Sequence, residues 1–479
     1  MANLFAGALQ ATEAIRWTSV FPYVYFMIES FEEVDASMIA FYAGLLIAVF
    51  TLGEFLSGMI WARVSDQIGR KAALLIGSAS SVIVTLIFET SHSPAQATIS
   101  RALGGLLNPN IGTIQTCVIE LTDTKEQRSY NLIGPVLGGI LADPSTLYPA
   151  IFPSNSLWGS YKYLLPNLTV ALLQLLTLVA VFLFLKETHP KLSAMPDPGM
   201  RLWHTIWTVL RWKTTKTTDG CYSPLNTDEA NLEQRSPTVP PEETEHELQN
   251  LDDVMTATDN QKESVPGSAF THQVILQILS VSLLAFHKVS SDAIMPTFLA
   301  APSETETENT RGFQESGGFN YSGQKIGFIL LSQAIFALCI QVTIVPLFVN
   351  RFGTLNAYRI VLGIYPFAYV FTPFLPRLGE PLALGIVALD LWAKVALSSV
   401  GYICSAVLIS DTTPAKEFLA RVNGASASTS CLARSIGPLV TGKLFAIGLE
   451  IGYVGIAFWI LSAIAFLDAV GSWFLRDHV

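Results

Sequence analysis

Charged residues are scarce in this chain of 479 residues. Only 14% of the residues are charged and 51% are hydrophobic, whereas soluble domains carry about a quarter charged residues. The chain is therefore too apolar for a soluble protein, which excludes a soluble enzyme. It also lacks a basic stripe of the kind that neutralises phosphate groups, so we expect no nucleic-acid partner.

Cysteine pairs and histidine clusters are missing as well. The five cysteines lie far apart and form no Cys-x-x-Cys pair, so neither a disulfide framework nor a structural zinc site is expected. No two of the seven histidines are close enough in sequence to indicate a shared metal ion. The nucleotide-binding pattern G-x-x-x-x-G-K-[ST] is also absent. We therefore expect no metal, no cofactor and no ATP-driven activity.

The negative charge of the chain is concentrated in one segment. Residues 217–271 hold twelve acidic and two basic residues, which equals the net charge of −10 of the whole chain. The region 187–271 is rich in proline and poor in aromatic residues, so it cannot bury enough apolar surface to offset the entropy lost on ordering. We interpret 187–271 as a disordered cytoplasmic linker. The alternative is a regulatory tail phosphorylated at Ser223, Ser236 or Thr238.

Long hydrophobic runs are abundant. A membrane-spanning helix needs about 20 mostly apolar residues, because only internally hydrogen-bonded backbone is stable in hydrocarbon. Eleven stretches meet this criterion: 6–28, 38–60, 72–90, 98–121, 163–186, 273–299, 325–349, 355–376, 382–410, 417–447 and 452–475. Between the fourth and the fifth lies Asn131–Asp143, a Gly- and Pro-rich run that is too short to cross unless it extends to Phe152. We treat this run as a doubtful twelfth span.

The positions of lysine and arginine test this count, because basic loops stay on the cytoplasmic side of a membrane. Basic residues cluster after the spans that end near residues 60, 121, 186 and 349 and around the start of the span at 417, whereas the opposite loops are acidic or neutral. Both halves of the chain follow the rule only if the short run also crosses. We therefore expect twelve spans, with both termini and the linker in the cytoplasm.

The two halves of the chain contain similar segments. Val64–Gly69 (VSDQIG) is similar to Phe348–Gly353 (FVNRFG), and Ile133–Gly138 (IGPVLG) is similar to Ile436–Gly442 (IGPLVTG). Gly69 and Gly134 are 65 residues apart in the first half, and their counterparts Gly353 and Gly437 are 84 residues apart in the second. The first half is therefore 19 residues shorter, near the fifth span. Shorter turns explain part of this difference, but we favour a real gap.

Three motifs resemble those of a known family. Trp61–Lys71 (WARVSDQIGRK) resembles the loop signature G-x-L-[AS]-D-R-x-G-R-[RK] of the major facilitator superfamily, and Arg101–Gly105 (RALGG) resembles its R-x-x-x-G element. Gly134–Gly139 (GPVLGG) resembles the G-P-x-x-G-G motif of the drug:proton antiporters in that family. Leu103–Thr116 and Thr18–Tyr23 look most similar to the fungal branch related to plant zinc-induced facilitator-like transporters.

The resemblance implies an all-α membrane fold of twelve helices in two six-helix halves, residues 1–186 and 272–479, with an abbreviated fifth helix. It implies a secondary active transporter, not an enzyme, which exports small organic or metal-linked solutes by proton-coupled alternating access. We expect a multi-pass monomer in the plasma or vacuolar membrane, with substrate, protons and the lipid bilayer as partners. The alternatives are an inactive product of a truncated gene and a regulatory membrane protein that does not transport.

The motifs supply candidate functional residues. Asp66, Gly69, Arg70 and Lys71 are expected to form a conformational latch, in which glycine permits a tight turn. A carboxylate in that turn can accept a hydrogen bond from a helix N-terminus or from its own arginine. The small motif residues permit close approach of helices, and they are Gly105, Gly134, Pro135, Gly138, Gly139, Gly437 and Pro438.

Ionisable residues inside the spans are candidates for proton coupling, because charge in lipid is costly and is retained mainly for function. They are Glu13, Glu54, Arg101 and Asp292. A carboxyl in a semi-dry cavity can exchange a proton as substrate binds. Structural alternatives stay open for three of these residues. Glu54 is alternatively a partner of the motif turn. Glu13 and Asp292 are alternatively members of simple helical ion pairs, with Arg16 and Lys288 respectively.

Three further features carry expectations. Asp390 and Lys394 are spaced for an ion pair within one helix, and His287 is expected to be a packing residue. Asn320 belongs to an Asn-Tyr-Ser acceptor in an acidic loop, which predicts a glycosylated position on the outer or lumenal side.

Overall fold

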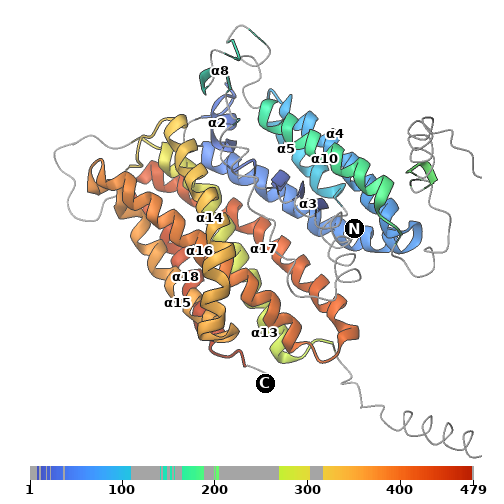
Figure 1. Ribbon diagram of the computed structural model, residues 1–479. Coiled ribbons are helices and arrows are strands. Elements are labelled where there is room, and N and C mark those ends of the chain that lie inside the picture. Colours follow the sequence, from blue (N-terminus) through green and yellow to red (C-terminus); the bar gives the residue numbers. More distant parts are fainter. Residues whose placement is uncertain are drawn as a thin grey trace, which may run out of the picture.

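Helices form the regular secondary structure of the computed structural model (Figure 1). The structure describes residues 8–9, 12–13, 15–17, 19–21, 23–35, 38–108, 141, 144–147, 151–153, 156, 164–187, 199, 201–203, 269–302 and 317–476. Most of the linker and of the short fifth span lies outside these ranges. The motif residues Gly134, Pro135, Gly138 and Gly139 also lie outside them, so the expectations for these segments stay predictions.

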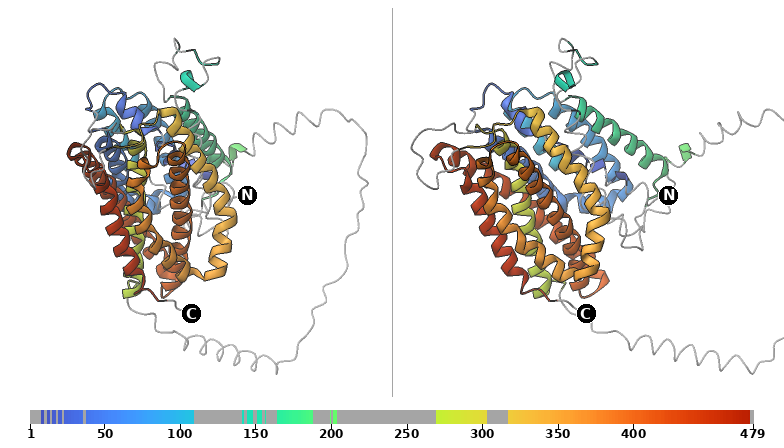
Figure 2. Two further views of the ribbon diagram at one scale, coloured as in Figure 1. Left: turned by 90° about the vertical axis from the view of Figure 1, so that its left-hand side faces the viewer. Right: turned by 60° about the vertical axis from the view of Figure 1, so that its left-hand side comes forward.

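The described part of the first half contains three helices of 20 residues or more and several shorter ones. They are α2 (Val24–Glu29), α3 (Ile39–Ile68), α4 (Arg70–Glu89), α5 (Pro94–Leu106), α8 (Pro144–Leu147) and α10 (Leu164–Phe184). Helix α3 packs on α5, and α4 packs on α10 (Figure 2). The start of α5 is fixed locally, because the Ser93 hydroxyl accepts a hydrogen bond from the Gln96 amide at 3.3 Å and Pro94 occupies the first helical position.

The second half contains α13 (His272–Ala300), α14 (Gly323–Phe352), α15 (Thr354–Phe371), the short 3₁₀ helix η2 (Thr372–Leu378), α16 (Leu382–Thr412), α17 (Lys416–Ile451) and α18 (Gly455–Ser472). Helix α14 bends by 48° between Gln341 and Thr343. Proline has no amide hydrogen, so Pro346 cannot donate to the carbonyl of residue 342, and the helix bends where that hydrogen bond is missing.

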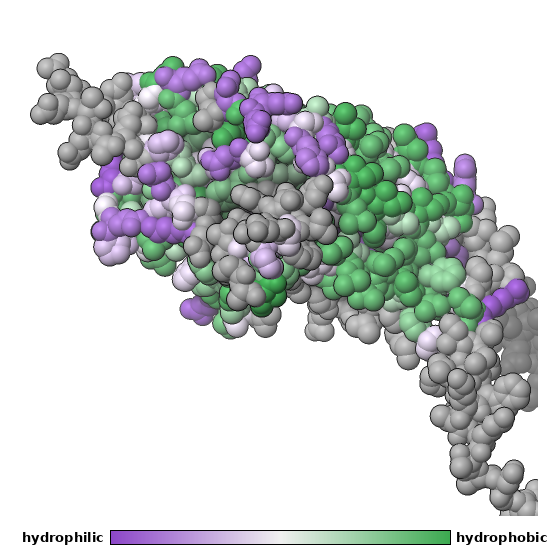
Figure 3. All heavy atoms as spheres, turned by 90° about the horizontal axis from the view of Figure 1, so that it is seen from above, coloured by the Kyte–Doolittle hydropathy of each residue, from purple (hydrophilic) through white to green (hydrophobic). Residues whose placement is uncertain are grey.

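Nine helical stretches in the described ranges are long and apolar enough to cross a membrane, if the bent α14 is counted as one. They correspond to nine of the eleven predicted spans. The other two, 6–28 and 98–121, extend beyond the described residues. Large apolar side chains such as Ile99, Leu347 and Phe367 are exposed on the helices. Seen from above, hydrophobic residues cover a broad, continuous area (Figure 3), as expected for a surface in contact with lipid.

Within the described ranges, α3 of the first half and α17 of the second half touch closely near one end of each helix. A Cβ atom on Gly44 of α3 would collide with the carbonyl oxygen of Pro438 in α17. A Cβ atom on Gly442 of α17 would lie 2.7 Å from the carbonyl oxygen of Ala40. The opposite ends of α3 and α17 lie apart in Figures 1 and 2. Helices α3 and α17 are therefore in close contact at the Ala40 end and separated at the other end.

The similar segments of the two halves adopt the same turn. Gly69 ends α3 with a φ of 98°, and Gly353 ends α14 with a φ of 77°. Residues with side chains rarely adopt this backbone conformation, so glycine is required at both turns. The repeat predicted from the sequence is visible here in the backbone.

Candidate functional site

The N-terminus of α4, within the motif turn, is occupied by a carboxylate that the sequence analysis did not single out. The Glu187 carboxylate, just beyond α10, accepts hydrogen bonds from the Arg70 amide at 2.9 Å and from the Lys71 amide at 3.1 Å. These amides have no partner within the helix, and the helix dipole favours a negative charge there. The sequence feature that could have identified Glu187 is its position as an acidic residue directly after an apolar span.

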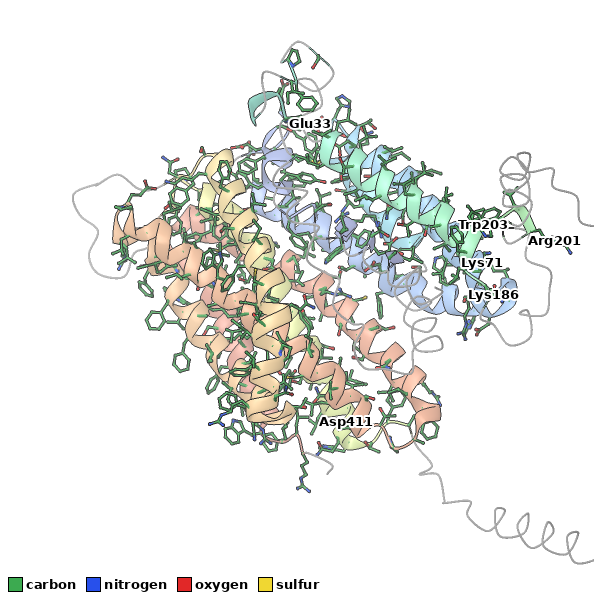
Figure 4. All side chains as sticks on the ribbon, in the orientation of Figure 1. Glu33, Lys71, Lys186, Arg201, Trp203 and Asp411 are labelled. Carbon is green, nitrogen blue, oxygen red and sulfur yellow. The ribbon has the colours of Figure 1, made fainter. Side chains whose placement is uncertain are left out.

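The candidate latch residues surround this contact. Asp66 is exposed at the end of α3 and makes no hydrogen bond or ion pair with a residue that the structure describes. The Lys71 ammonium is buried and lies 5.8 Å from the centroid of the Phe182 ring. Lys71 and Lys186 lie at the same end of the helices, and Glu33 lies at the other (Figure 4).

Glu13 is held in a local ion pair. The Arg16 guanidinium donates to Glu13 Oε2 at 2.7 Å from Nη2 and at 3.1 Å from Nε. Gln174 of α10 donates to the other carboxylate oxygen at 3.3 Å. The alternative of a simple ion pair with Arg16 therefore describes the geometry in this conformation.

Glu54 is buried in the middle of α3, where its side chain reaches the end of α5. Asn108 Nδ2 donates to Glu54 Oε1 at 2.9 Å, and only 8% of Glu54 is exposed. Its hydrogen-bond partner is thus Asn108 and not a residue of the motif turn. Arg434 of α17 and Arg16 both lie within electrostatic range of the carboxyl. Glu54 is therefore a buried acid that interacts with both halves of the molecule.

Arg101 of α5 lies within electrostatic range of Glu54 but makes no hydrogen bond or ion pair with a candidate acid that the structure describes. Its guanidinium lies 4.6 Å from the Phe50 ring centroid and 5.3 Å from that of Phe88. It is 5% exposed, and its buried Nε has no hydrogen-bond partner. A small cavity is lined by Arg101, Arg16 and other residues of the first half. The structure thus brings Glu13 and Arg16 together but does not pair Arg101 with Glu13 or Glu54.

In the second half, the charges predicted to pair do so. Lys288 donates to Asp292 on α13. Lys394 donates to Asp390 at 2.6 Å on α16, and to the Thr372 hydroxyl at 2.5 Å. The side chain of Asp292 is 31% exposed, so it is more open than the Asp390 carboxylate, which is 12% exposed.

His287 and Asp468 form a buried polar contact that sequence reasoning did not identify. Both side chains are fully buried, with His287 Nε2 3.9 Å from Asp468 Oδ2. His287 Nδ1 lies 3.0 Å from the Tyr369 hydroxyl, and the Ser280 hydroxyl donates to Asp468 Oδ1 at 2.6 Å. His287 thus has polar partners on α15 and α18, beyond the packing role we expected. The sequence feature that could have identified this contact is Asp468, an acidic residue within the apolar run of α18.

The small motif residues that the structure describes lie at close helix contacts. A Cβ atom on Gly105 of α5 would collide with the carbonyl oxygen of Phe50 in α3. A Cβ atom on Gly437 of α17 would lie 2.9 Å from the carbonyl oxygen of Phe286 in α13. Together with Pro438 against Gly44, these contacts place α17 against both α13 and α3.

Comparisons with known sequences agree with this arrangement. The family model described as Major Facilitator Superfamily matches residues 8–438. The major facilitator superfamily multidrug transporter mfsB of Aspergillus fumigatus is 35% identical over 504 aligned positions, covering 99% of this chain and 83% of that relative. The alignment is longer than the chain, so mfsB has residues without a counterpart here. The protein ZINC INDUCED FACILITATOR 1 of Arabidopsis thaliana is 24% identical and covers 92% of this chain and 83% of its own.

Solved structures show the same fold. The xylose transporter XylE from E. coli, in a partially occluded inward-open conformation, gives a TM-score of 0.60 at 13% identity and covers 100% of this chain and 98% of its own. The human organic anion transporter MFSD10 gives a TM-score of 0.56 at 16% identity, with 98% of each chain covered. Together with the helices and motifs described above, these matches show that the chain belongs to the major facilitator superfamily, as a multi-pass membrane protein that functions as a secondary active transporter.

Proposed function

We propose that this transporter exports small organic solutes, including metal-linked ones, in exchange for protons. The observation that carries proton exchange is Glu54, a carboxyl buried inside a membrane span and hydrogen-bonded by the neutral amide of Asn108. A carboxyl that is hydrogen-bonded by a neutral amide can gain or lose a proton without breaking an ion pair. Export of organic solutes is supported by the multidrug relative and by the drug:proton antiporter motif of the fifth span.

Protonation of Glu54 changes the attraction between the halves. Arg434 of α17 acts electrostatically on the Glu54 carboxyl of α3, across the contact between the two halves. When the carboxyl is protonated, this attraction is lost, and the relative free energies of the inward-facing and outward-facing conformations change. A ligand shifts a conformational equilibrium only through such a difference in interaction energy. Proton binding at Glu54 is therefore a means of driving alternating access.

Glu13, Asp292 and the four residues of the motif turn also have assigned roles in this proposal. Glu13 is a second proton-binding carboxyl, released from Arg16 when it is protonated, and Asp292 is its counterpart in the second half. Asp66, Gly69, Arg70 and Lys71 form the latch of the opposite conformation, in which the separated ends of α3 and α17 close. In that state Asp66 would accept from the N-terminus of α17, where helical amides lack partners.

The proposal includes an organisation in the membrane. Residues 1–186 and 272–479 move as two units about the contact between α3 and α17, and 187–271 is the cytoplasmic linker. The protein acts as a monomeric glycoprotein of the plasma or vacuolar membrane. The chain aligns with solved transporters over 98% or more of both chains, and its multidrug relative is 35% identical, which favours a transporter over an inactive or regulatory membrane protein.

Transport in proteoliposomes tests the function. Purified protein is reconstituted with a panel of organic solutes inside or outside, with and without a pH gradient. We expect solute to accumulate against its gradient only when protons flow in the opposite direction. Glu54→Gln should lose this accumulation but keep solute exchange at equal pH. Glu450→Gln, which changes an exposed acid at the end of α17, should behave like the wild type. Full proton-driven accumulation by Glu54→Gln would refute the assignment.

A further inference from the structure

The first half holds a buried positive charge that its own acidic side chains do not neutralise. Arg101 is 5% exposed, and within the described ranges its guanidinium makes no hydrogen bond or ion pair. A buried charge is strongly unfavourable unless it is paired and hydrogen-bonded. The faces of Phe50 and Phe88 attract the guanidinium through cation–π contacts. The N–H groups of the guanidinium lie in its plane and donate no hydrogen bond to these rings. The hydrogen-bonding capacity of Arg101 therefore stays unused.

The nearby carboxylates are engaged elsewhere. Glu13 binds Arg16 and Gln174, and Glu54 accepts from Asn108. Glu89, at the end of α4, accepts from Asn167 through one carboxylate oxygen, and its other oxygen has no hydrogen-bond partner, so it does not bond Arg101 either. The Arg16 guanidinium lies 5.0 Å from the same Phe50 ring that supports Arg101. Two guanidinium groups thus lie on one ring, and only Arg16 has a carboxylate partner.

These groups meet in a cavity. It is lined by both arginines, by Thr85 of α4 and by Asn167 of α10, whose amide bonds Tyr23 and Glu89, together with apolar residues. It has room for about one water-sized particle. Thr85 is buried, and its hydroxyl makes no hydrogen bond within the described part of the chain. The cavity therefore presents donors from Arg101, Arg16 and Thr85, and it is too small for a whole organic solute.

We propose that this cavity binds one compact monovalent anionic group, with the Arg101 guanidinium as its principal partner and Arg16 and Thr85 as further donors. A chloride ion and the carboxylate end of a solute share this chemistry. The bound group neutralises Arg101, reduces repulsion between the two arginines and links the first span to α4 and α5. This site does not depend on the proposed proton exchange at Glu54, because its formation is a binding event at other groups.

Anion-dependent stability of the full-length protein tests the site. Thermal unfolding is followed by tryptophan fluorescence in detergent at constant ionic strength, in sodium MES, whose bulky sulfonate does not fit the cavity. Chloride or acetate then replaces MES stepwise. A ligand that binds the folded state raises the unfolding temperature saturably with its concentration. We expect this rise in the wild type with at least one of the two anions. A response to chloride identifies a free inorganic ion, and a response to acetate alone identifies a carboxylate group.

Substitutions assign the response to the cavity. Arg101→Gln should raise the half-saturating anion concentration at least about tenfold, since hydrogen bonds to a charged group contribute that much or more. Thr85→Val, which removes one hydroxyl donor at nearly constant volume, should raise it by a smaller factor. Arg421→Gln changes an exposed arginine of α17 and should leave the response unchanged.

Two results would overturn the proposal. One is a wild type whose unfolding temperature is the same in MES, chloride and acetate, and this result needs no variant to fold. The other is an undiminished response in Arg101→Gln. Neither result bears on transport coupled to Glu54, which the proteoliposome experiment measures separately.

Discussion

At the scale of single residues, Lys394 shows how the interior of a membrane helix accommodates a charge. Its ammonium is 3% exposed and donates to Asp390 and Thr372. Removing one partner of a buried ion pair leaves the other charge unpaired, which typically costs about 3–5 kcal/mol. We predict that Lys394→Met lowers the free energy of unfolding by about 3 kcal/mol, and that adding Asp390→Leu recovers part of the loss. Denaturant unfolding in detergent measures both.

Lys325 offers a matched control at the surface. It pairs with Glu380, and the two side chains are 32% and 56% exposed. Water screens this pair, so Lys325→Met should lower the free energy of unfolding much less than Lys394→Met. Equal losses from the two lysine substitutions would contradict the argument from burial.

Pairs within one helix could be predicted from the sequence, whereas pairs between helices could not. The spacing of Lys288 and Asp292 places them on one helical face whatever surrounds the helix. His287 and Asp468 meet only because α13 packs on α18. The contact of Glu187 with the start of α4 likewise depends on how α4 and α10 pack. Such contacts are set by tertiary structure, which the spacing of residues along one helix does not encode.

At the scale of elements, the contact between α3 and α17 depends on a missing side chain. Gly44→Val should collide with the backbone at Pro438 and separate the two halves at this end. We predict lower thermal stability and loss of transport. Gly58 in the same helix has nothing within 4 Å of its added Cβ, so Gly58→Val should leave both nearly unchanged. If the two variants were equally active, backbone contact at Gly44 would not be required.

The motif turn gives a second prediction for an element. Asp66 is exposed and makes no hydrogen bond or ion pair within the described ranges, so Asp66→Asn should not change thermal stability in this conformation. If Asp66 acts in the opposite conformation, the same substitution should slow transport severely while protein still reaches the membrane. Unfolding in detergent and uptake into proteoliposomes measure the two effects. Wild-type transport by this variant would eliminate the latch.

The extents of the long helices follow from the apolar runs, and the described spans begin and end close to the predicted residues. Local chemistry accounts for this agreement, because a run of about 20 apolar residues in lipid has to satisfy its backbone within a helix. The bend of α14 could also have been predicted from the sequence, since Pro346 lies inside the predicted span. The close contact of α3 with α17 at one end could not be predicted from the sequence, because it is a property of one conformation of the two halves.

At the scale of the whole molecule, Asn320 tests the sidedness in the membrane. Asn320 is exposed in the segment before α14. Its backbone N–H donates to the Ala301 carbonyl at 2.8 Å, so the side-chain amide is not used in this bond. We predict that the protein made in a eukaryotic host carries a glycan there, removed by an endoglycosidase and absent from Asn320→Gln. A cysteine at position 320 that reacts only with reagents supplied from the cytoplasm would reverse the topology.

The shortfall in the first half gives a prediction for the whole chain. Asn131–Ile140 lies outside the described residues, so the abbreviated fifth span remains a prediction. Inserting the corresponding residues of the Aspergillus relative after Tyr130 should raise membrane yield and transport together, because a longer apolar run inserts more readily. Unchanged yield, with twelve crossings already present in the unmodified chain by reporter fusion, would show that the shorter segment is sufficient.

The hydrogen bonds from Arg70 and Lys71 to Glu187 have a consequence for biosynthesis. The Arg70 amide and its acceptor are 117 residues apart in the chain. Synthesis proceeds from the N-terminus, so the start of α4 leaves the ribosome well before its carboxylate partner exists. Until α10 has been made and inserted, the amides at this turn have to rely on water or lipid headgroups. The family's characteristic loop therefore reaches its final structure only after the last helix of the first half has entered the membrane.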